Sequence, residues 1–384
     1  MKLARRHFLH LAAGAAVLPV LPVPFSAFPQ SAPNPDNTAE ATPSERSSMS
    51  SLASEFMQQH DVPGLSVAIG RAGALVYQDA FGFADREKRE AVSPMHFFRI
   101  ASVSKPITSV AIFSLIEEGR IRLTDRVFGP GAITGIDYGR PPYRLDRRGV
   151  DDITVEDLLT HTSGSWNNSK SDPMFANPEM NHARLIEWTL RTRPLEHSPG
   201  QEYAYSNFGY CVLGRVIEKV TGQPYAAYVR NSVLKRCGIN DMTIAGNTLA
   251  QRRPEEVKYY GGENPYGINI TRMDSNGGWI ARPADLVQFL MHVSGFAAPP
   301  NILKPDTIAI MTAPSNANSG YAKGWMVNKA NDWWHNGSLP GTATIAVRTH
   351  SGFCWAAFAN TRCPNTYLHK LVSDMVREVK SWQV

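Results

Sequence analysis

The first candidate for chemistry in this sequence is a serine followed three residues later by a lysine, Ser102 and Lys105. In a helix, that spacing places the hydroxyl and the amine on the same face. A serine hydroxyl is a weak nucleophile at neutral pH, and a lysine accepts its proton only where burial or positive charge lowers the lysine pKa. A helix N-terminus adds positive potential and N–H groups that can face an oxyanion. The pair predicts a nucleophile and its base, although the same spacing also occurs by chance.

A second polar pair, Tyr205 and Asn207, stands where the pattern changes from a loop to a helix. Tyr205 could relay protons if a lysine ammonium lowered its pKa, and Asn207 could bind a substrate carbonyl or hold Lys105. The alternative interpretation is an ordinary helix cap, with Ser206 or Asn207 beginning the helix.

A third group, His335-Asn336-Gly337, stands at the edge of a β-type pattern. A glycine there would let a substrate backbone approach the strand, and the N–H of Ser338 could donate to an oxyanion. The alternative is a β-turn that carries a surface histidine.

Two other residues resemble catalytic groups without the right surroundings. His161 could complete a Ser/His/Asp arrangement, but Lys105 already offers a base, so we expect His161 to close a short helix and to bond loop backbone. Ser66 lies in a run that almost matches the Gly-x-Ser-x-Gly elbow, but Ala68 replaces the last glycine and a hairpin surrounds it. We therefore exclude Ser66 as the nucleophile.

The elements that must position these residues follow from the hydrophobic pattern. After Lys105, apolar residues recur every three or four positions, which is typical of a helix with one buried face. Runs near both chain ends have β-type patterns, and the middle is mostly helical. Expected strands span 65–71, 74–82, 324–327, 342–348 and 353–359, and expected helices span 49–59, 182–190, 207–220, 225–234 and 365–381, with another from Pro283. This order favours an α+β fold: an antiparallel sheet from both chain ends flanked by helices, with a mostly helical lobe inserted at about 120–290.

The N-terminal residues have the pattern of a targeting segment. Arg5 and Arg6 precede an apolar run that is short and rich in Pro and Gly, which indicates a twin-arginine export signal rather than a membrane span. We expect residues 1–32 to be this signal, 33–48 a flexible linker, and 49–384 the folded domain. The protein is then periplasmic or secreted, with no stable membrane span after export.

Composition excludes several functions. The formal net charge is +5, but Lys2, Arg5 and Arg6 carry three of these charges and the others are interspersed with acids, so nucleic acid is a poor partner. The four cysteines form no C-x-x-C pair and have no metal-like spacing with histidine, so no metal site is expected. Cys354 and Cys363 could be buried thiols or could form a disulfide across a hairpin.

Together, the motifs Ser102-Val-Ser-Lys105, Tyr205-Ser-Asn207 and His335-Asn-Gly337 occur in the order of the serine β-lactamase and penicillin-binding-protein superfamily. The chain resembles the class C branch and the related serine hydrolases, where Tyr-x-Asn replaces Ser-Asp-Asn. The resemblance covers about residues 50–380, including the connecting stretch 157–164.

The resemblance implies a β-lactamase/transpeptidase-like fold and an acyl-enzyme mechanism. Ser102 would attack an amide, lactam or ester carbonyl, and Lys105 and Tyr205 would share the proton, with the division between them open. Asn207 would orient the substrate, and the N–H groups of Ser102 and Ser338 would form the oxyanion hole. The family's mechanism needs no metal or organic cofactor.

One departure from the family pattern affects the expected substrate. His335 stands where class C β-lactamases have lysine, and an imidazole binds a carboxylate less firmly than an ammonium does. His-x-Gly resembles the variant in some D-alanyl-D-alanine peptidases, D-aminopeptidases and esterases. We therefore expect an exported serine hydrolase acting on an ester or a D-amino-acid peptide. The alternatives are a class C-like β-lactamase and a non-catalytic penicillin- or peptidoglycan-binding relative; nothing in the sequence indicates an oligomeric state.

Overall fold

The structure, a computed structural model, describes residues 40–139, 149–168 and 172–382. The predicted export signal, 1–32, lies outside the described residues, as do residues 33–39 of the predicted linker. The domain boundaries expected from the sequence therefore stay a prediction.

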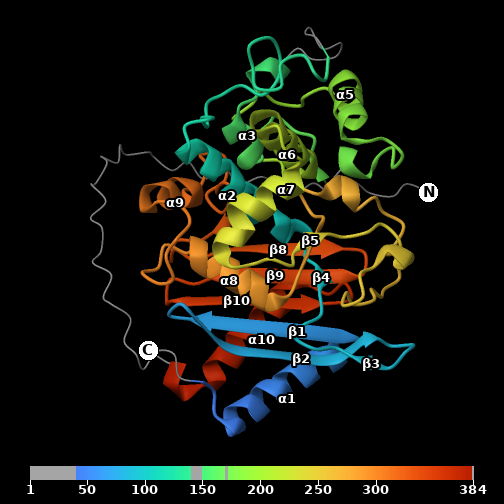
Figure 1. Cartoon of the computed structure of the whole chain (residues 1–384), viewed down its shortest axis with the longest axis vertical. Helices are drawn as coiled ribbons and strands as arrows, with labels where there is room; N and C mark the ends of the chain where they lie inside the picture. The colour runs from blue at the N-terminus through green and yellow to red at the C-terminus, as the bar shows by residue number, and fades with distance from the viewer. Residues whose placement is uncertain (1–39, 140–148, 169–171, 383–384) are drawn as a thin grey trace, which may run out of the picture. The chain divides into compact units, whose positions relative to one another are not determined.

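A seven-stranded antiparallel sheet forms the centre of the described chain (Figure 1). Strands from the two chain ends meet at its middle, where Ala68 pairs with Ala356. This confirms the α+β fold and the sheet assembled from both ends. The strands, in sheet order, are β3 (Glu90–Ala91), β2 (Ala74–Asp85), β1 (Gly64–Arg71), β10 (Phe353–Ala359), β9 (Thr342–Arg348), β8 (Trp333–Leu339) and β7 (Met326–Val327).

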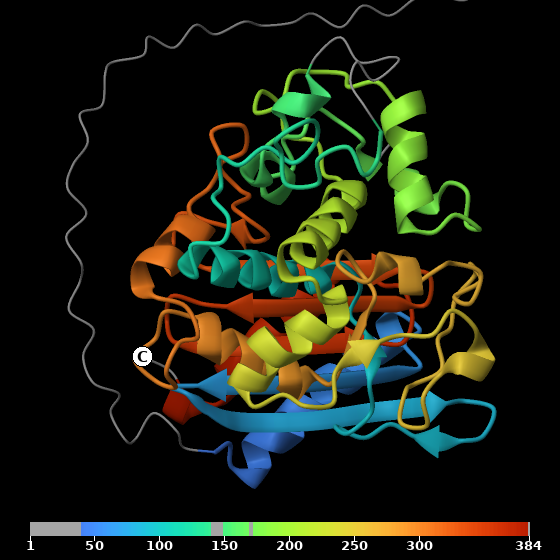
Figure 2. The ribbon, with the colours of Figure 1, turned by 45° about the horizontal axis from the view of Figure 1, so that its top comes forward.

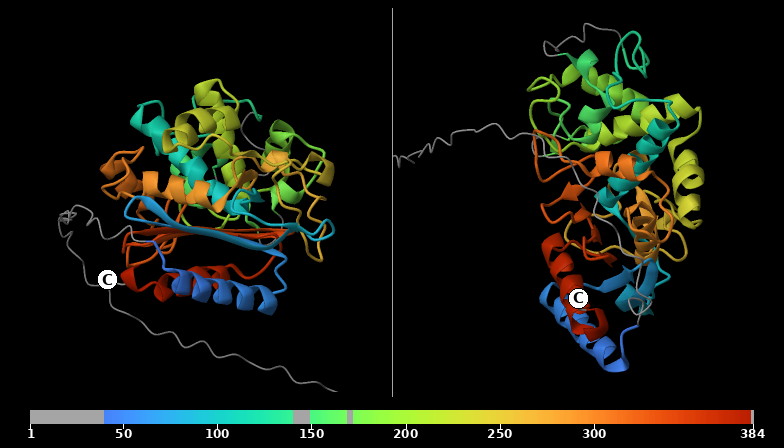
Figure 3. Two further views of the ribbon diagram at one scale, coloured as in Figure 1. Left: turned by 60° about the horizontal axis from the view of Figure 1, so that its bottom comes forward. Right: turned by 90° about the vertical axis from the view of Figure 1, so that its left-hand side faces the viewer.

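Helices cover both faces of this sheet. On one face, α1 (Pro43–Gln59) packs against α10 (Asn365–Glu378), and α10 packs on β9 and β10 (Figure 3). On the other face, α8 (Pro283–Val293) packs on β1 and β10. Side chains alternate between the faces of a strand, so Leu65 joins the core beneath α1 and α10, whereas Ala68 joins the larger core on the opposite face.

The inserted lobe is mostly helical, as expected, and is built on α2 (Ser104–Glu117), which packs against α6 (Asn207–Thr221) (Figure 2). A small second sheet, which the sequence did not predict, lies alongside with the order β4-β6-β5. The other elements here are α3 (Val155–Leu159), α5 (His182–Thr192), α7 (Tyr225–Val229), α9 (Pro305–Thr312), β4 (Phe98–Arg99), β5 (Thr243–Ile244) and β6 (Trp279–Ala281).

Some boundaries differ from the expected ones for local reasons. Helix α1 begins at Pro43 rather than at Met49, because Thr42 and Glu45 form a capping box and Pro43 suits the first helical position. Residues 43–48, expected in the linker, are therefore helical. The expected helix 225–234 changes at Arg230 from α7 to one wider turn.

Other features bear on the expectations above. All four cysteines are buried free thiols, so the hairpin disulfide is not formed. Within the described ranges, no helix is both long and apolar enough to cross a membrane.

Candidate active site

The nucleophile candidate lies on a strained turn. Ser102 is half-buried in a 3₁₀ turn, Ala101–Val103, that leads into α2, so it precedes the helix that was expected to carry it. Ala101 has a φ of 47°, in the left-handed region that residues with a side chain rarely adopt. The turn is held from β9, where the Thr344 hydroxyl donates to the carbonyl of Ile100 at 2.9 Å.

Gly337 has a structural role that differs from the expected one. A Cβ at Gly337 would lie 2.3 Å from the carbonyl oxygen of Ile100 and 3.0 Å from Cβ of Ala101. The glycine therefore lets β8 lie directly against the turn before Ser102. Approach of a substrate backbone was the role expected from the sequence, but the close neighbour in the structure is this turn.

Lys105 is completely buried and makes three hydrogen bonds. Its Nζ lies 3.0 Å from Ser102 Oγ, 2.7 Å from Asn207 Oδ1 and 3.0 Å from the carbonyl oxygen of Asn276. Burial lowers the pKa of Lys105 to about 7, although the charge of Asp172 opposes the shift. In the neutral amine, two N–H bonds can point at Asn207 and Asn276, which leaves the lone pair for the Ser102 proton.

Tyr205 reaches the same point from the loop before α6. Its phenol hydrogen bonds with the side chain of Ser102, and Lys105 Nζ lies 4.8 Å from its ring centroid. Burial is the main influence on its pKa and raises it, whereas the bond to Ser102 opposes the shift. The condition under which Tyr205 could relay protons as a phenolate, a pKa lowered by a lysine ammonium, is therefore not met, because loss of solvent dominates. Tyr205 is protonated at neutral pH.

Asn207 is the first residue of α6. The residue that caps this helix is Ser206, whereas the residue that contacts Lys105 is Asn207. Ser206 caps the helix by accepting from the Gly209 N–H at 3.0 Å, which leaves the Asn207 amide free to face Lys105. The Asn207 amide is oriented from behind, because its Nδ2 donates to Oδ2 of Asp172 at 2.7 Å. Asp172 is 7% exposed, and burial raises its pKa.

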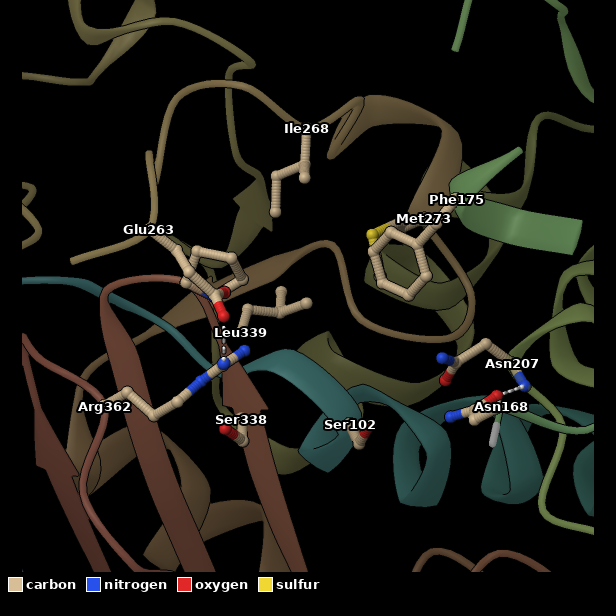
Figure 4. Close-up of a pocket in the computed structure, with 11 residues that line it drawn as sticks. Ser102, Asn168, Phe175, Asn207, Glu263, Ile268, Met273, Ser338, Leu339 and Arg362 are labelled. Atoms are coloured by element: carbon tan, nitrogen blue, oxygen red, sulfur yellow. Dashed lines mark hydrogen bonds and ion pairs between the residues drawn. The ribbon is translucent and has the colours of Figure 1, made fainter. Parts of the chain in front are cut away.

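A pocket of about 410 Å³ opens above Ser102 (Figure 4). Figure 4 shows Ser102 between Ser338 of β8 on one side and Asn168 and Asn207 on the other, where Oδ1 of Asn168 accepts from the main-chain N–H of Asn207 at 3.1 Å. Apolar side chains form the wall above: Phe175, Ile268 and Met273. On the Ser338 side, Glu263 and Arg362 form an ion pair of 3.0 Å.

Comparison with known protein families identifies the family of this chain. The model of the family described as "Beta-lactamase" matches residues 49–371, most of the chain. The chain belongs to the β-lactamase family. It is therefore a member of a serine hydrolase superfamily, as the three motifs indicated.

Two proteins that are similar to this chain are a staphylococcal protein and an archaeal penicillin-binding protein homologue. Protein flp of Staphylococcus aureus (strain N315) is 26% identical over 345 residues, which cover 84% of this chain and 64% of that protein. This chain thus matches less than two thirds of that relative's length. The octameric penicillin-binding protein homologue from Pyrococcus abyssi has a TM-score of 0.71 at 22% identity, covering 88% of this chain and 78% of its own.

A third similar protein is the D-amino acid amidase from Ochrobactrum anthropi SV3, in its complex with D-phenylalanine. Its TM-score is 0.71 at 18% identity, covering 88% of this chain and 100% of its own. At such identities these two structures establish the fold and not the substrate.

The third motif of this β-lactamase-family chain does not face the pocket. His335 is fully buried; its Nδ1 lies 2.6 Å from the carbonyl oxygen of Asn336 and its Nε2 lies 3.2 Å from the Tyr321 hydroxyl. Burial, reinforced by the charge of Lys105, lowers the pKa of His335 to about 3. The alternative of a surface histidine is therefore wrong. The imidazole is neutral and lies beside the rings of Tyr205 and Tyr321, with 6.2 Å and 5.9 Å between centroids, rather than at the pocket surface.

The structure thus brings Ser102, Lys105, Tyr205 and Asn207 together, with Ser338 across the pocket and Gly337 beneath the turn. Sequence reasoning missed Asp172, Asn276 and Tyr321. Asn276 contributes a main-chain carbonyl, which no residue type reveals, and Asp172 lies in a loop without periodicity. No cluster of metal-ligating side chains occurs in the part of the chain that the structure describes.

Proposed function

We propose that this protein hydrolyses esters or D-amino-acid peptides through an acyl-enzyme on Ser102. The observation that carries the proposal is the 3.0 Å contact between Lys105 Nζ and Ser102 Oγ, made by an amine with a pKa of about 7. A base with a pKa near the working pH is the most effective general base.

The geometry supports a division of labour between the two proton carriers. Neutral Lys105 takes the proton of Ser102 while Oγ forms a bond to the substrate carbonyl carbon. Tyr205 is protonated and lies beside Ser102, so it donates its proton as the bond to the leaving group breaks, and the Lys105 ammonium returns a proton to it. The N–H groups of Ser102 and Ser338 stabilise the oxyanion, and water then hydrolyses the acyl-enzyme with the proton movements reversed.

The pocket supports esters and D-amino-acid peptides over β-lactams. The third motif places no cation at the substrate, because His335 is neutral and buried. A carboxylate next to the scissile bond, as β-lactams carry, therefore lacks a partner from this motif. The similarity to a D-amino acid amidase and a penicillin-binding protein homologue supports the D-amino-acid class. Of the two D-amino-acid activities, a D-aminopeptidase type fits this site better, because the substrate of a D-Ala-D-Ala carboxypeptidase also carries a carboxylate next to its scissile bond.

One experiment tests both the nucleophile and the substrate class. The wild-type protein and Ser102→Ala are compared on a p-nitrophenyl ester, nitrocefin, a D-Ala-D-Ala peptide and a D-aminoacyl anilide, and mass spectrometry locates a fluorophosphonate adduct. We expect an adduct on Ser102 and turnover of the ester or of a D-amino-acid substrate, with at least a 1000-fold loss in Ser102→Ala. Turnover of nitrocefin alone would support the class C-like alternative, and an adduct without any turnover would support the non-catalytic one.

Export is proposed from the sequence pattern of residues 1–32. If the Arg5-Arg6 pair directs twin-arginine transport, a double Arg5→Lys, Arg6→Lys variant will accumulate inside the cell while the wild-type protein reaches the periplasm or the medium. Cell fractionation with activity measurement checks this, and equal export of both proteins would contradict it.

A further inference from the structure

His161 lies outside the proposed machinery but is unusual in conformation and burial. It follows α3, is 1% exposed, and has a φ of 60°. This left-handed region is uncommon for residues other than glycine, although histidine adopts it more often than most. The sequence predicted that His161 bonds loop backbone, and the structure identifies the loop as the one that carries Tyr205.

His161 holds the chain on both sides of Tyr205. Its carbonyl oxygen accepts from the N–H of Ala204 at 2.8 Å, and its Nδ1 accepts from the N–H of Ser206 at 3.1 Å. Its ring packs on the Tyr205 ring, with 4.3 Å between centroids. The two amides next to Tyr205 and the ring itself are therefore fixed by one residue.

The hydrogen-bond partners also determine the tautomers in this cluster. Because Nδ1 of His161 accepts a proton, Nε2 carries the hydrogen of the neutral ring and donates to the Tyr321 hydroxyl at 3.1 Å. Tyr321 in turn donates to Nε2 of His335 at 3.2 Å, and Nδ1–H of His335 donates to the Asn336 carbonyl. This buried chain links the loop of Tyr205 to β8, which carries Ser338.

The groups facing His161 disfavour its protonated form, which makes the imidazole a weak base, and its acceptor nitrogen Nδ1 is already occupied by the Ser206 N–H. Tyr203, Tyr205, Tyr210 and Tyr321 surround the ring, with centroids 4.3 to 5.9 Å away. Burial is the main cause that lowers the pKa of His161, and a positive charge on Lys105 adds to it. The remaining role for His161 is to hold neighbouring groups in position.

We propose that His161 is a positioning residue that fixes the Tyr205 phenol beside Ser102, with Tyr321 extending the same support to β8. The proposal rests on the proposed function, in which Tyr205 protonates the leaving group. A displacement of about 1 Å in a catalytic group can cost on the order of 100-fold in rate. Substitution of His161 should therefore lower the rate for those substrates whose leaving group needs a proton from Tyr205.

Two esters with the same acyl group separate this role from a general structural one. Phenyl acetate has a basic leaving group that needs a proton, whereas p-nitrophenyl acetate has one that leaves unaided. We expect His161→Gln, which loses the Nδ1 acceptor, to lower kcat/KM by roughly 10- to 100-fold for phenyl acetate and by less than about 3-fold for p-nitrophenyl acetate. Equal losses for both esters would show a merely structural role.

A matched variant and a double-mutant cycle complete the test. His161→Asn keeps an acceptor at the Nδ1 position and tolerates a positive φ, so it should retain most of the phenyl acetate activity. In a Tyr205→Phe background, His161→Gln should cause no further loss, because the group that it positions is absent. Additive losses, or equal losses in the Asn and Gln variants, would overturn the proposal. If the wild-type protein cleaves neither ester and forms no Ser102 adduct, the proposed function fails first.

Discussion

At the scale of single residues, burial sets the protonation of the candidate groups more strongly than the neighbouring charges do. Lys105 has its pKa lowered and Tyr205 has its pKa raised, and loss of solvent is the first cause in both cases. Both shifts favour the neutral form of the group. The site therefore contains a neutral amine able to accept a proton and a phenol able to donate one.

The first prediction concerns the pH dependence of acylation. Lys105 acts as a base only when unprotonated, so kcat/KM should rise through a midpoint near pH 7. The Asp172 carboxylate raises the Lys105 pKa, so Asp172→Asn should move this midpoint to lower pH. An amide at position 172 has one oxygen that can still accept from Asn207 Nδ2, although it gives up the second bond that Asp172 accepts, from the N–H of Met174. A pH profile of ester hydrolysis checks the shift, and an unmoved or raised midpoint would contradict it.

A second residue-scale prediction concerns the departure from the class C lysine. His335→Lys would bury an ammonium without an anionic partner in the position of a neutral imidazole. We expect it to destabilise the fold by about 3 kcal/mol and to bring no gain in nitrocefin turnover. Thermal unfolding and nitrocefin assays measure both effects, with the neutral His335→Gln as control. A stable Lys variant with increased nitrocefin turnover would show that a lysine at position 335 can reach the substrate, and would contradict this prediction.

At the scale of elements, the site depends on the contact between β8 and the turn before Ser102. Strand β8 alternates strictly, with Trp333, His335, Gly337 and Leu339 buried. Gly337 permits the contact, and Thr344 of the neighbouring β9 bonds the same turn. The nucleophile and the expected oxyanion donor of Ser338 are thus held by the adjacent strands β8 and β9.

The third prediction follows from this contact. Gly337→Ala should force β8 away from the Ile100 carbonyl, with a loss of about 1–3 kcal/mol in stability and a loss of acylation rate larger than the loss of folded protein. Gly262→Ala is the matched control, because a Cβ at Gly262 meets no atom within 4 Å. Unfolding curves and the rate of fluorophosphonate labelling measure the two effects. Similar behaviour of both variants would refute the structural role of Gly337.

The sequence predicted the helices and strands whose apolar residues repeat regularly over several turns of a helix or most of a strand. Strands β1, β2, β9 and β10 and the helices α6 and α8 follow from apolar periodicity. Helix α9 has only eight residues and was missed. The burial of His335 was also missed, although alternation from Trp333 places it on the buried face of β8. Asp172 carried no signal, because its position depends on a loop that packs against α6.

At the scale of the whole described domain, the pocket gathers side chains from segments far apart in the chain. Ser102 follows the first strands, Asn168 and Asn207 belong to the inserted lobe, and Arg362 follows the last strand of the sheet. Of the side chains that line the described pocket, the ionised ones are Glu263 and Arg362, and they neutralise each other. The pocket therefore presents no net charge to the substrate and favours neutral groups.

The last prediction tests whether this pair sets the preference for substrate charge. Glu263→Gln frees the Arg362 guanidinium, whose side chain is 47% exposed, so a negatively charged ester should gain relative to a neutral one. Because exposed charges interact weakly in water, we expect a change of roughly 3- to 10-fold in the ratio of kcat/KM values at low salt, and less at high salt. Competing hydrolysis of a neutral acetate ester and a succinate half-ester gives the ratio. The gain should disappear in the double variant with Arg362→Gln; if it persists there, Arg362 is not the cation that the substrate meets.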